Sequence, residues 1–260
     1  GAYDGKAHGI TVSGVPEGAT VKYGTVKENC DADSSPVYTD FTDGEKTVYV
    51  KVSKENYNDW SGSATVTITK STPAAPSGLA IVKPSEFGKS DGKITGTTDA
   101  MEYSKTEDFA SAIDCAGTEV AGLAAGTYYV RIKGTANTNA SACVEVTVAE
   151  GDKKTFEGIT VTGFSGVYDG KAHGITISGV PEGATVKYGT VEGTCDSDSI
   201  TFTDFTNGAK TVYVKVSKEG YSDWSGSATV TITRSTPEEP KGLAGVRTSE
   251  FGKNDGRITG

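Results

Sequence analysis

A long internal repeat constrains this chain more than any other feature. Residues 1–26 recur at residues 166–191 with two substitutions, Ala2/Val167 and Val12/Ile177. The duplication continues through segments whose first copies are TVYVKVS at 47–53, WSGSATVTIT at 60–69 and SEFGKSDGKITG at 85–96. The offset between the copies falls from 165 to 164 residues after Cys30, so one residue was lost where loops tolerate change. Such a repeat favours linked or stacked domains over a single-site enzyme.

The repeat divides the chain into four predicted domains. Their ranges are 1–72, 73–150, 151–236 and 237–260, the third resembling the first and the fourth beginning like the second. STPAAP at 71–76 and STPEEP at 235–240 are short proline-rich segments that predict stiff, extended connectors. Domains of this size bury little interior, which leaves small room for a deep catalytic pocket.

The two ends of the chain differ from its centre. Residues 156–166 (FEGITVTGFSG) predict an opening strand for the third domain, and no such residues precede Gly1. We therefore expect the first domain to lack its first strand and to expose an edge that invites strand exchange. The range 237–260 lacks most of its partner strands, so we expect it to be poorly ordered on its own.

Apolar residues alternate with polar ones in the strongest segments, and alternation is typical of strands with one buried face. The residues expected to face the interior are Val48, Val50 and Val52 in one segment and Ala64, Val66 and Ile68 in the next. Turns are predicted at four Asp-Gly or Asn-Gly pairs, at 4–5, 43–44, 91–92 and 207–208. This pattern predicts antiparallel β-sandwiches, because parallel sheets read as continuous apolar runs.

The middle domain has a different set of predicted strands. They span 93–96, 101–104, 118–122, 127–133 and 143–149. In TYYVRIK, we expect Tyr128, Val130 and Ile132 to point inward.

The charge pattern argues against nucleic acid as a partner. The net charge is −9, and acidic and basic residues are interspersed, so no basic stripe forms along the chain. No apolar run approaches the ~20 residues that cross a bilayer, so we expect no membrane insertion in this segment. No signal peptide or anchor is visible, and we interpret the chain as a fragment of a longer protein.

Four cysteines occur in the chain. Cys30 and Cys195 take equivalent places in the two copies, and Cys115 and Cys143 belong to the middle domain. Parity with Val144 places Cys143 on the outer face, which disfavours a bond across the core to Cys115, although spacing alone leaves that pairing open. No pair has the spacing of a metal site, and we predict no metal and no cofactor.

The opening block identifies a family resemblance. YDGKAHGITVSGVPEGATVKYGT at 3–25, with TVYVKVS and GSATVTIT after it, resembles the bacterial immunoglobulin-like repeats called MBG or YDG domains. The middle domain, with GKITGTTDAMEYS and GLAAGTYYVRIKGT, is similar to a second immunoglobulin-like repeat of exported Gram-positive proteins. The resemblance implies an all-β protein of tandem immunoglobulin-like antiparallel β-sandwich domains in an elongated array. It brings no catalytic residues.

Histidines and paired aspartates are the first candidates for chemistry. His8 and His173 are equivalent, and no nucleophile motif accompanies either, so a structural role near a turn is favoured over catalysis. The pairs Asp31/Asp33 and Asp196/Asp198 could supply oxygen ligands to calcium, but nothing nearby completes a recognisable loop. A solvated acidic loop is the favoured interpretation.

Aromatic residues are the candidates for ligand binding. The predicted residues are Tyr57 and Trp60 with their copies Tyr221 and Trp224, and the outward-facing strand residues Tyr49 and Tyr213. Flat rings at such places stack on sugars or anchor a protein partner. The competing interpretation is that each indole caps the end of its sandwich core.

These features predict a non-catalytic repeat region of an adhesin-like protein that is secreted or attached to a bacterial surface or cell wall. It would act as a stalk, as a repeated binding module, or as both. The expected partners are a host glycoprotein or protein, such as secreted immunoglobulin or mucin, or a cell-wall polysaccharide. The alternative is an accessory region of an exported carbohydrate-active enzyme.

Overall fold

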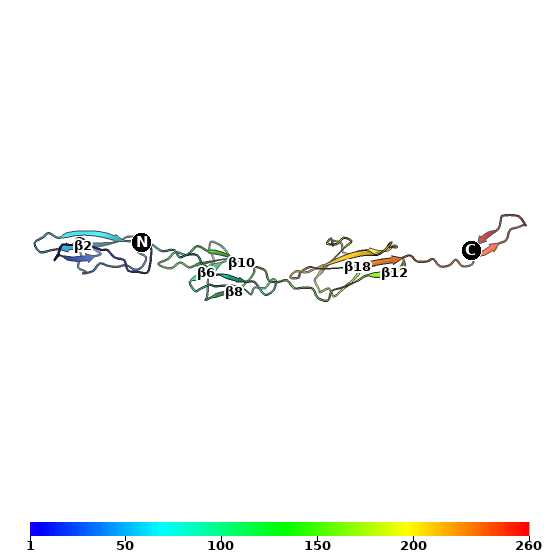
Figure 1. Cartoon of the computed structure of the whole chain (residues 1–260), viewed down its shortest axis with the longest axis horizontal. Helices are drawn as coiled ribbons and strands as arrows, with labels where there is room; N and C mark the ends of the chain where they lie inside the picture. The colour runs from blue at the N-terminus through cyan, green and yellow to red at the C-terminus, as the bar shows by residue number, and fades with distance from the viewer. Residues whose placement is uncertain (260) are drawn as a thin grey trace. The chain divides into compact units, whose positions relative to one another are not determined.

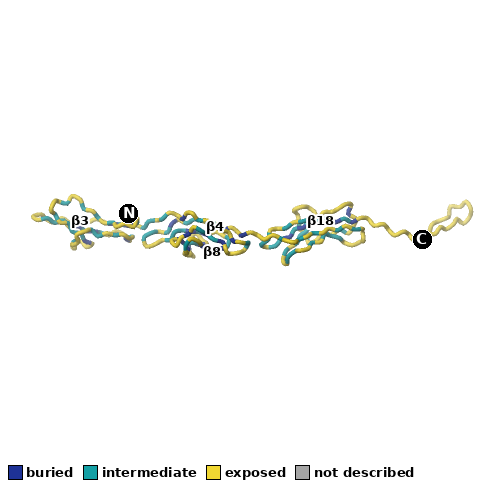
Figure 2. Tube along the Cα trace, turned by 60° about the horizontal axis from the view of Figure 1, so that its bottom comes forward, coloured by how far each residue is buried: buried dark blue, intermediate teal, exposed yellow. Residues whose placement is uncertain are grey.

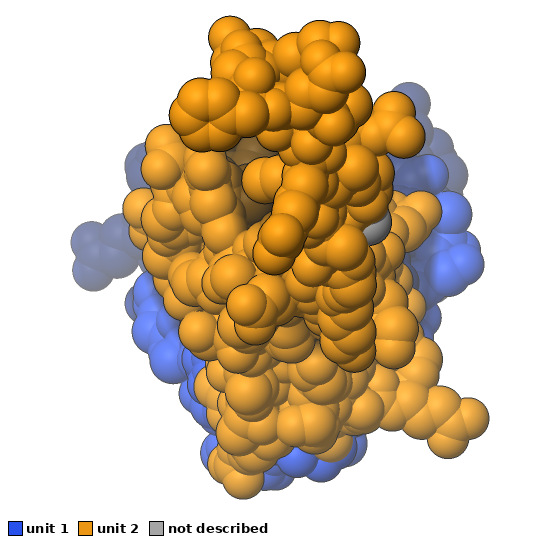
Figure 3. All heavy atoms as spheres, turned by 90° about the vertical axis from the view of Figure 1, so that its right-hand side faces the viewer, with its two compact units in different colours: residues 1–152 blue, residues 153–260 orange. Residues whose placement is uncertain are grey.

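The computed structural model describes residues 1–259, and this part of the chain is built from β-strands without helices. It forms two compact units, residues 1–152 and 153–260 (Figure 3). Each sheet lies inside one of the predicted ranges, and we call the first three ranges the first, middle and third domains. The four boundaries stay predictions. The fourth range includes Gly260, which lies outside the described residues.

The first domain has one three-stranded antiparallel sheet. Its order is β1 (Thr20–Gly24), β2 (Lys46–Ser53) and β3 (Trp60–Val66). Val48, Val66 and Ile68 form the core, with four half-buried apolar side chains packed around them. Val48 and Val50 are buried as predicted. The prediction was wrong for Ala64, which is exposed on β3, an edge strand that pairs only with β2 in this sheet.

The third domain carries a larger set of strands from a nearly identical sequence. Its main sheet has the order β12 (Phe164–Val167), β18 (Trp224–Thr233), β17 (Lys210–Ser217) and β15 (Thr185–Gly189). Two small sheets pair β11 (Thr160–Thr162) with β14 (Thr176–Ser178), and β13 (His173–Gly174) with β16 (Thr201–Phe202). Val212, Val230 and Ile232 form its core.

The opening strand of the third domain differs from its prediction. Residues 156–166 do not form one strand, because β11 and β12 belong to different sheets on either side of Gly163. Gly163 lies so close to the backbone of Thr229 that a side chain would not fit, which lets the chain cross from sheet to sheet there. β12 runs parallel to β18, beside which it lies in Figure 1, so the predicted sandwich is not wholly antiparallel.

The middle domain packs two sheets around its own core. One sheet has the order β4 (Ala80–Val82), β5 (Gly92–Thr95) and β8 (Glu119–Leu123); the other has β10 (Val144–Val148), β9 (Gly126–Ile132), β6 (Met101–Ser104) and β7 (Ile113–Asp114). The five predicted strands are confirmed to within one residue at each end. Tyr128 and Val130 are buried as predicted, and Ile132 packs against the same core.

Three of the four predicted turns have the backbone that such pairs favour. Asp43 and Gly44 both have positive φ, as do Asn207 and Gly208, and Gly5 has a φ of 75°. The fourth prediction was wrong, because Gly92 is buried at the start of β5. A side chain there would meet the backbone of β8 and a side chain of β10, so close packing requires this glycine.

The chain after residue 236 forms a short hairpin. β19 (Ala244–Val246) pairs with β20 (Arg257–Thr259), and every residue of both strands is exposed. Figure 2 shows this contrast, with buried residues inside the first three domains and an exposed hairpin at the end. Poor order of this range in isolation stays a prediction.

Candidate functional site

A hollow of about 510 Å³ lies on the outer face of the main sheet in the third domain. We call it the tyrosine hollow. Its lining comes from β17, β18 and the loop before β16: Glu192, Gly193, Cys195, Tyr213, Val214, Lys215, Asp223, Ser225, Gly226 and Ser227. Tyr213 pairs in register with Gly189 on one side and Ser227 on the other, which sets its ring in the middle of the sheet.

One wall of the tyrosine hollow is a tight loop. Val191 and Thr194 form an isolated bridge, and the Thr194 N–H donates to the Val191 carbonyl at 3.2 Å. The loop then crosses close over Gly189, where a side chain would collide with the Thr194 backbone. Gly189 therefore lets Cys195 lie at the edge of the sheet.

An ion pair between Lys215 and Asp223 borders the tyrosine hollow. Lys215 Nζ lies 2.7 Å from Asp223 Oδ2, and this hydrogen bond raises the pKa of Lys215. Both side chains are about half exposed, so the pair can exchange partners with a ligand. Together with the Ser225 and Ser227 hydroxyls, it surrounds a flat ring with hydrogen-bonding groups.

The same side chains recur in the first domain. The counterparts of the lining are Cys30, Tyr49, Lys51, Asp59, Ser61 and Ser63. Lys51 pairs with Asp59 at 2.8 Å, and that hydrogen bond likewise raises the pKa of the lysine. The loop differs, since Lys27 and Glu28 stand where the third domain has Glu192 and Gly193.

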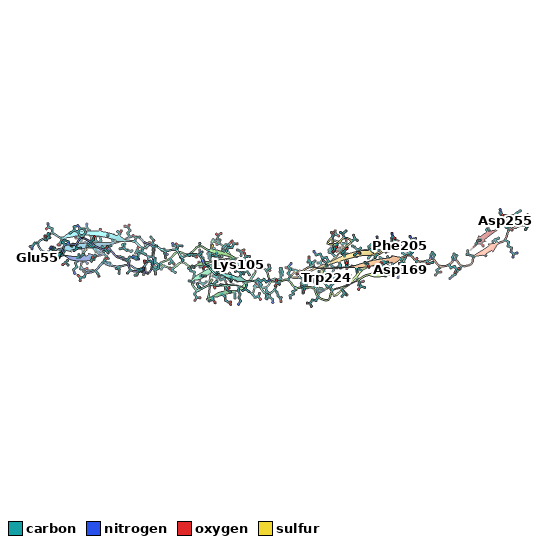
Figure 4. The ribbon with its side chains drawn as sticks, in the orientation of Figure 1. Glu55, Lys105, Asp169, Phe205, Trp224 and Asp255 are labelled. Atoms are coloured by element: carbon teal, nitrogen blue, oxygen red, sulfur yellow. The ribbon has the colours of Figure 1, made fainter. Side chains whose placement is uncertain are left out.

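The structure divides the six predicted aromatic residues between two places. Tyr49 and Tyr213 lie on the outer face, as their strand positions predicted. The other four lie at one end of each sandwich, and Trp224 at the start of β18 is labelled in Figure 4, with Phe205 toward the opposite end of the same domain. The sequence did not lead us to predict that Cys195, Lys215 and Asp223 are neighbours of Tyr213. The available signal was that Lys215, two residues after Tyr213, lies on the same outer face of its strand.

The end-of-sandwich aromatics take different environments in the two copies. Tyr57 is 70% exposed and Trp60 is 57% exposed. In the third domain Tyr221 stacks on Phe156, with ring centroids 4.8 Å apart, and Trp224 is half-buried. Each indole folds back over the glycine two residues later on its own strand. Neither indole is among the side chains that pack against the two cores, and both interpretations of these residues stay predictions.

The histidines hold turns in place. His8 Nε2 lies 2.8 Å from Asp4 Oδ1, and His173 Nε2 lies 2.8 Å from Asp169 Oδ1. These hydrogen bonds are the main cause that lowers the pKa of each aspartate. Phe164 stacks on the His173 ring, with centroids 3.7 Å apart.

The acidic loops are engaged by lysines. Lys22 Nζ lies 2.5 Å from Asp33 Oδ1, and Lys187 Nζ lies 2.5 Å from Asp198 Oδ1. The lysine hydrogen bond lowers the pKa of Asp198. No group of three or more potential metal ligands occurs in residues 1–259. The same residues contain no helix long and apolar enough to cross a membrane.

All four thiols are free. Cys115 is buried in the middle domain, and burial is the main cause that raises the pKa of its thiol. Cys143 is half-buried and directly precedes β10, whose Val146 and Val148 belong to or pack against the core. A second hollow, of about 640 Å³, lies in this domain beside Tyr103, Lys105 and Asp108.

Comparisons with known proteins give weak likenesses only. No family profile and no curated protein matches the chain. Among solved structures, immunoglobulin domains 1–4 of Sidekick-1 share 11% identity at a TM-score of 0.21, covering 88% of this chain and 74% of that one. The eight N-terminal immunoglobulin domains of Down syndrome cell adhesion molecule share 8% identity at 0.24, covering 90% and 34%. The Bacteroides ovatus protein SGBP-B, in complex with a mixed-linkage heptasaccharide, shares 13% at 0.18, covering 88% and 63%.

The chain thus spans about a third of the Down syndrome cell adhesion molecule structure it matches. Scores this low carry no argument about function. The assignment of tandem immunoglobulin-like sandwiches rests on the strand pairing and the separate cores described above.

Proposed function

We propose that this chain is a non-catalytic repeat region of an adhesin-like protein on a bacterial exterior, and that the tyrosine hollow is its repeated binding site. The observation that carries this proposal is recurrence. Tyr, Lys, Asp, two Ser and Cys occupy matching positions of both copies, although the loop beside them has changed in sequence. Lining residues that are the same in both copies, next to a loop whose residues differ, favour the binding of one ligand class with different contacts from the loop in each copy.

The chemistry of the lining favours a carbohydrate ligand. A sugar presents an apolar ring face and a rim of hydroxyls, and the Tyr213 ring with the two serine hydroxyls and the Lys215–Asp223 pair complements both parts. The hollow is open and mostly solvent-exposed, so each site alone would bind weakly. Two sites on one chain raise the apparent affinity for a polymer by avidity. A cell-wall polysaccharide or the glycans of a mucin would be such a polymer.

The joint between the first and middle domains favours a stalk role alongside binding. Asn137 accepts a hydrogen bond from the Phe41 N–H and donates one to the Asp40 carboxylate, both at 2.8 Å. Ser71, at the start of the proline-rich connector, bridges to Thr138. A connector held by its neighbour resists bending more than a free linker does.

The test uses the full chain on immobilised mucin and on immobilised Gram-positive cell-wall polysaccharide. We expect Tyr49→Ala or Tyr213→Ala alone to weaken apparent affinity by about tenfold or more, through lost avidity, and the double variant to abolish binding. Tyr129→Ala is the matched control, because Tyr129 lies on a strand of the middle domain outside the hollow. A double variant that binds both polymers as the parent does would refute the site.

A further inference from the structure

The loop between β6 and β7, residues 105–112, lines the hollow of about 640 Å³ in the middle domain. We call this hollow the middle hollow. Leu123 at the end of β8 and Tyr128 on β9 also line it, and both side chains belong to the buried core. Ligand pockets in proteins usually measure about 300–1,000 Å³, so the middle hollow has room for a small organic ligand.

Hydrogen bonds inside the 105–112 loop fix the position of one carboxylate. Asp108 Oδ1 accepts from the Thr106 hydroxyl at 2.6 Å and from the Ala110 N–H at 3.0 Å. These two bonds, the first more than the second, lower the pKa of Asp108. The carboxylate therefore stays ionised, and Oδ2 is left to accept a hydrogen bond from a ligand.

Phe109 anchors the loop with a backbone conformation that bulky residues rarely adopt. Its φ is 55°, and its side chain is 7% exposed. The Arg131 guanidinium lies 3.9 Å from the centroid of the Phe109 ring, and Glu102 holds Arg131 through a hydrogen bond of 2.6 Å. Backbone strain persists where the surrounding structure enforces it, often at sites that bind ligands. Here it places Asp108 and Ala110, the two neighbours of Phe109, on the lining of the middle hollow.

Lys105, labelled in Figure 4, differs from the other basic residues of the middle domain. Lys105 Nζ lies 5.8 Å from the centroid of the Tyr128 ring, and the lysine belongs to no ion pair of the described residues. A cation above an aromatic face keeps its hydrogen-bond donors for a carboxylate. The other basic residues are all ion-paired, Lys83 with Asp152, Lys89 with Glu86, Lys93 with Glu119, Arg131 with Glu102 and Lys133 with Asp114.

The rest of the lining has the chemistry that a sugar needs. Ser90 and Ser111 are exposed, and their hydroxyls make no hydrogen bond within the described residues. With Asp108 Oδ2 they complement the hydroxyls of a sugar, and Ile113, which is 54% exposed, offers apolar surface to the ring. A single lysine suits the one charge of a carboxylate, whereas proteins hold a phosphate with several donors.

We propose that the middle hollow binds a pyranose ring that carries a carboxylate, with Lys105 as the anchor. Lys105 Nζ donates to the carboxylate, and Ser90, Ser111 and Asp108 bind the ring hydroxyls. The uronic acids of polysaccharides and the sialic acids of animal glycans share this chemistry. The middle hollow lies in a different domain from the tyrosine hollow and its counterpart, so this inference does not depend on the proposed function.

Titration of the full chain with short sugars, followed by NMR, tests the proposal without any contribution from avidity. The Tyr49→Ala/Tyr213→Ala background keeps the result separate from the tyrosine hollow. We expect saturable shifts of the amides of residues 104–112 with trigalacturonic acid, with sialyllactose or with both, and the sugar that responds identifies the source. The uncharged counterparts, trigalacturonic acid methyl ester and lactose, should bind about tenfold more weakly or not at all. Absence of shifts with both acidic sugars overturns the proposal.

Matched lysine variants assign the site. Lys105→Met removes the charge and should weaken binding by about tenfold or more, whereas Lys105→Arg keeps the charge and should bind within about threefold of the parent. Lys93→Met removes a paired lysine outside the lining and should leave binding unaltered. The amide spectra of the variants check that they fold. Equal loss in the two methionine variants overturns the proposal, as does equally tight binding of N-acetylalanine, a carboxylate without a sugar ring.

Discussion

One buried threonine in the first domain and one in the third accept a hydrogen bond from a backbone N–H that is distant in the sequence. Thr206 Oγ1 accepts a hydrogen bond from the Ile232 N–H at 3.0 Å, and Thr42 Oγ1 does the same for Ile68. Both side chains are 4% exposed. In sequence they are ordinary threonines of TDFT segments, and nothing in alternation or spacing marks them. Their role depends on a backbone donor 26 residues away, which only the folded chain brings near.

We predict that Thr206→Val destabilises the third domain by about 1–3 kcal/mol, because the buried Ile232 N–H loses its acceptor while the shape of the side chain is kept. Urea denaturation followed by Trp224 fluorescence, in a Trp60→Phe background, measures this. Thr206→Ser keeps the hydroxyl and should lose less than half as much. Equal stability of the valine variant and its parent would contradict the assignment.

At the scale of elements, two residues make long-range contacts that fix how neighbouring segments are connected, Gly163 and Asn137. Gly163 divides one predicted strand into two because its backbone passes against Thr229. Asn137 makes a long-range contact at the joint between the first and middle domains. Its side-chain amide donates a hydrogen bond to the Asp40 carboxylate and accepts one from the Phe41 N–H. Alternation of apolar residues predicts strands, but it contains no information on these long-range backbone contacts.

We predict that Asn137→Ala loosens the joint between the first and middle domains. Loss of both hydrogen bonds should speed amide exchange at Phe41 by about tenfold, since each bond contributes about 0.5–1.5 kcal/mol. Asn139→Ala removes a single side-chain bond, to Thr72, and serves as the control with a smaller effect on Phe41. Hydrogen exchange measured by NMR gives both rates, and unchanged exchange at Phe41 would sink the idea of a held connector.

At the scale of the whole chain, two nearly identical sequences have unequal cores. The third domain has β11, β12, β13, β14 and β16 in addition to the counterparts of the three strands of the first domain, and β18 is ten residues long where β3 has seven. Val216 and Trp224 are correspondingly better covered than Val52 and Trp60. In tandem arrays each domain contributes its own free energy of unfolding. The difference in apolar burial should therefore appear as a difference between the unfolding transitions of the two domains.

For a polypeptide of residues 1–260, we predict that the first domain unfolds at lower denaturant concentration than the third, with a difference of about 2 kcal/mol or more from the additional apolar burial of the third. Trp224→Phe leaves Trp60 to report on the first domain, and Trp60→Phe leaves Trp224 to report on the third. Coincident unfolding transitions in the two variants would show that residues 154–167 contribute little to the stability of the third domain.

The sequence by itself determined the repeat, the all-β class, five of the seven strands of the middle domain to within a residue and the outward placement of Tyr49 and Tyr213. Those properties depend on local alternation and on internal comparison, which a sequence displays directly. Only the tertiary structure decided the parallel pairing of β12, the exposure of Ala64 and the meeting of Cys195, Lys215 and Asp223 around Tyr213. The physical reason is that pairing and burial depend on which distant segment covers a residue, and identical residues in the two copies have different covers.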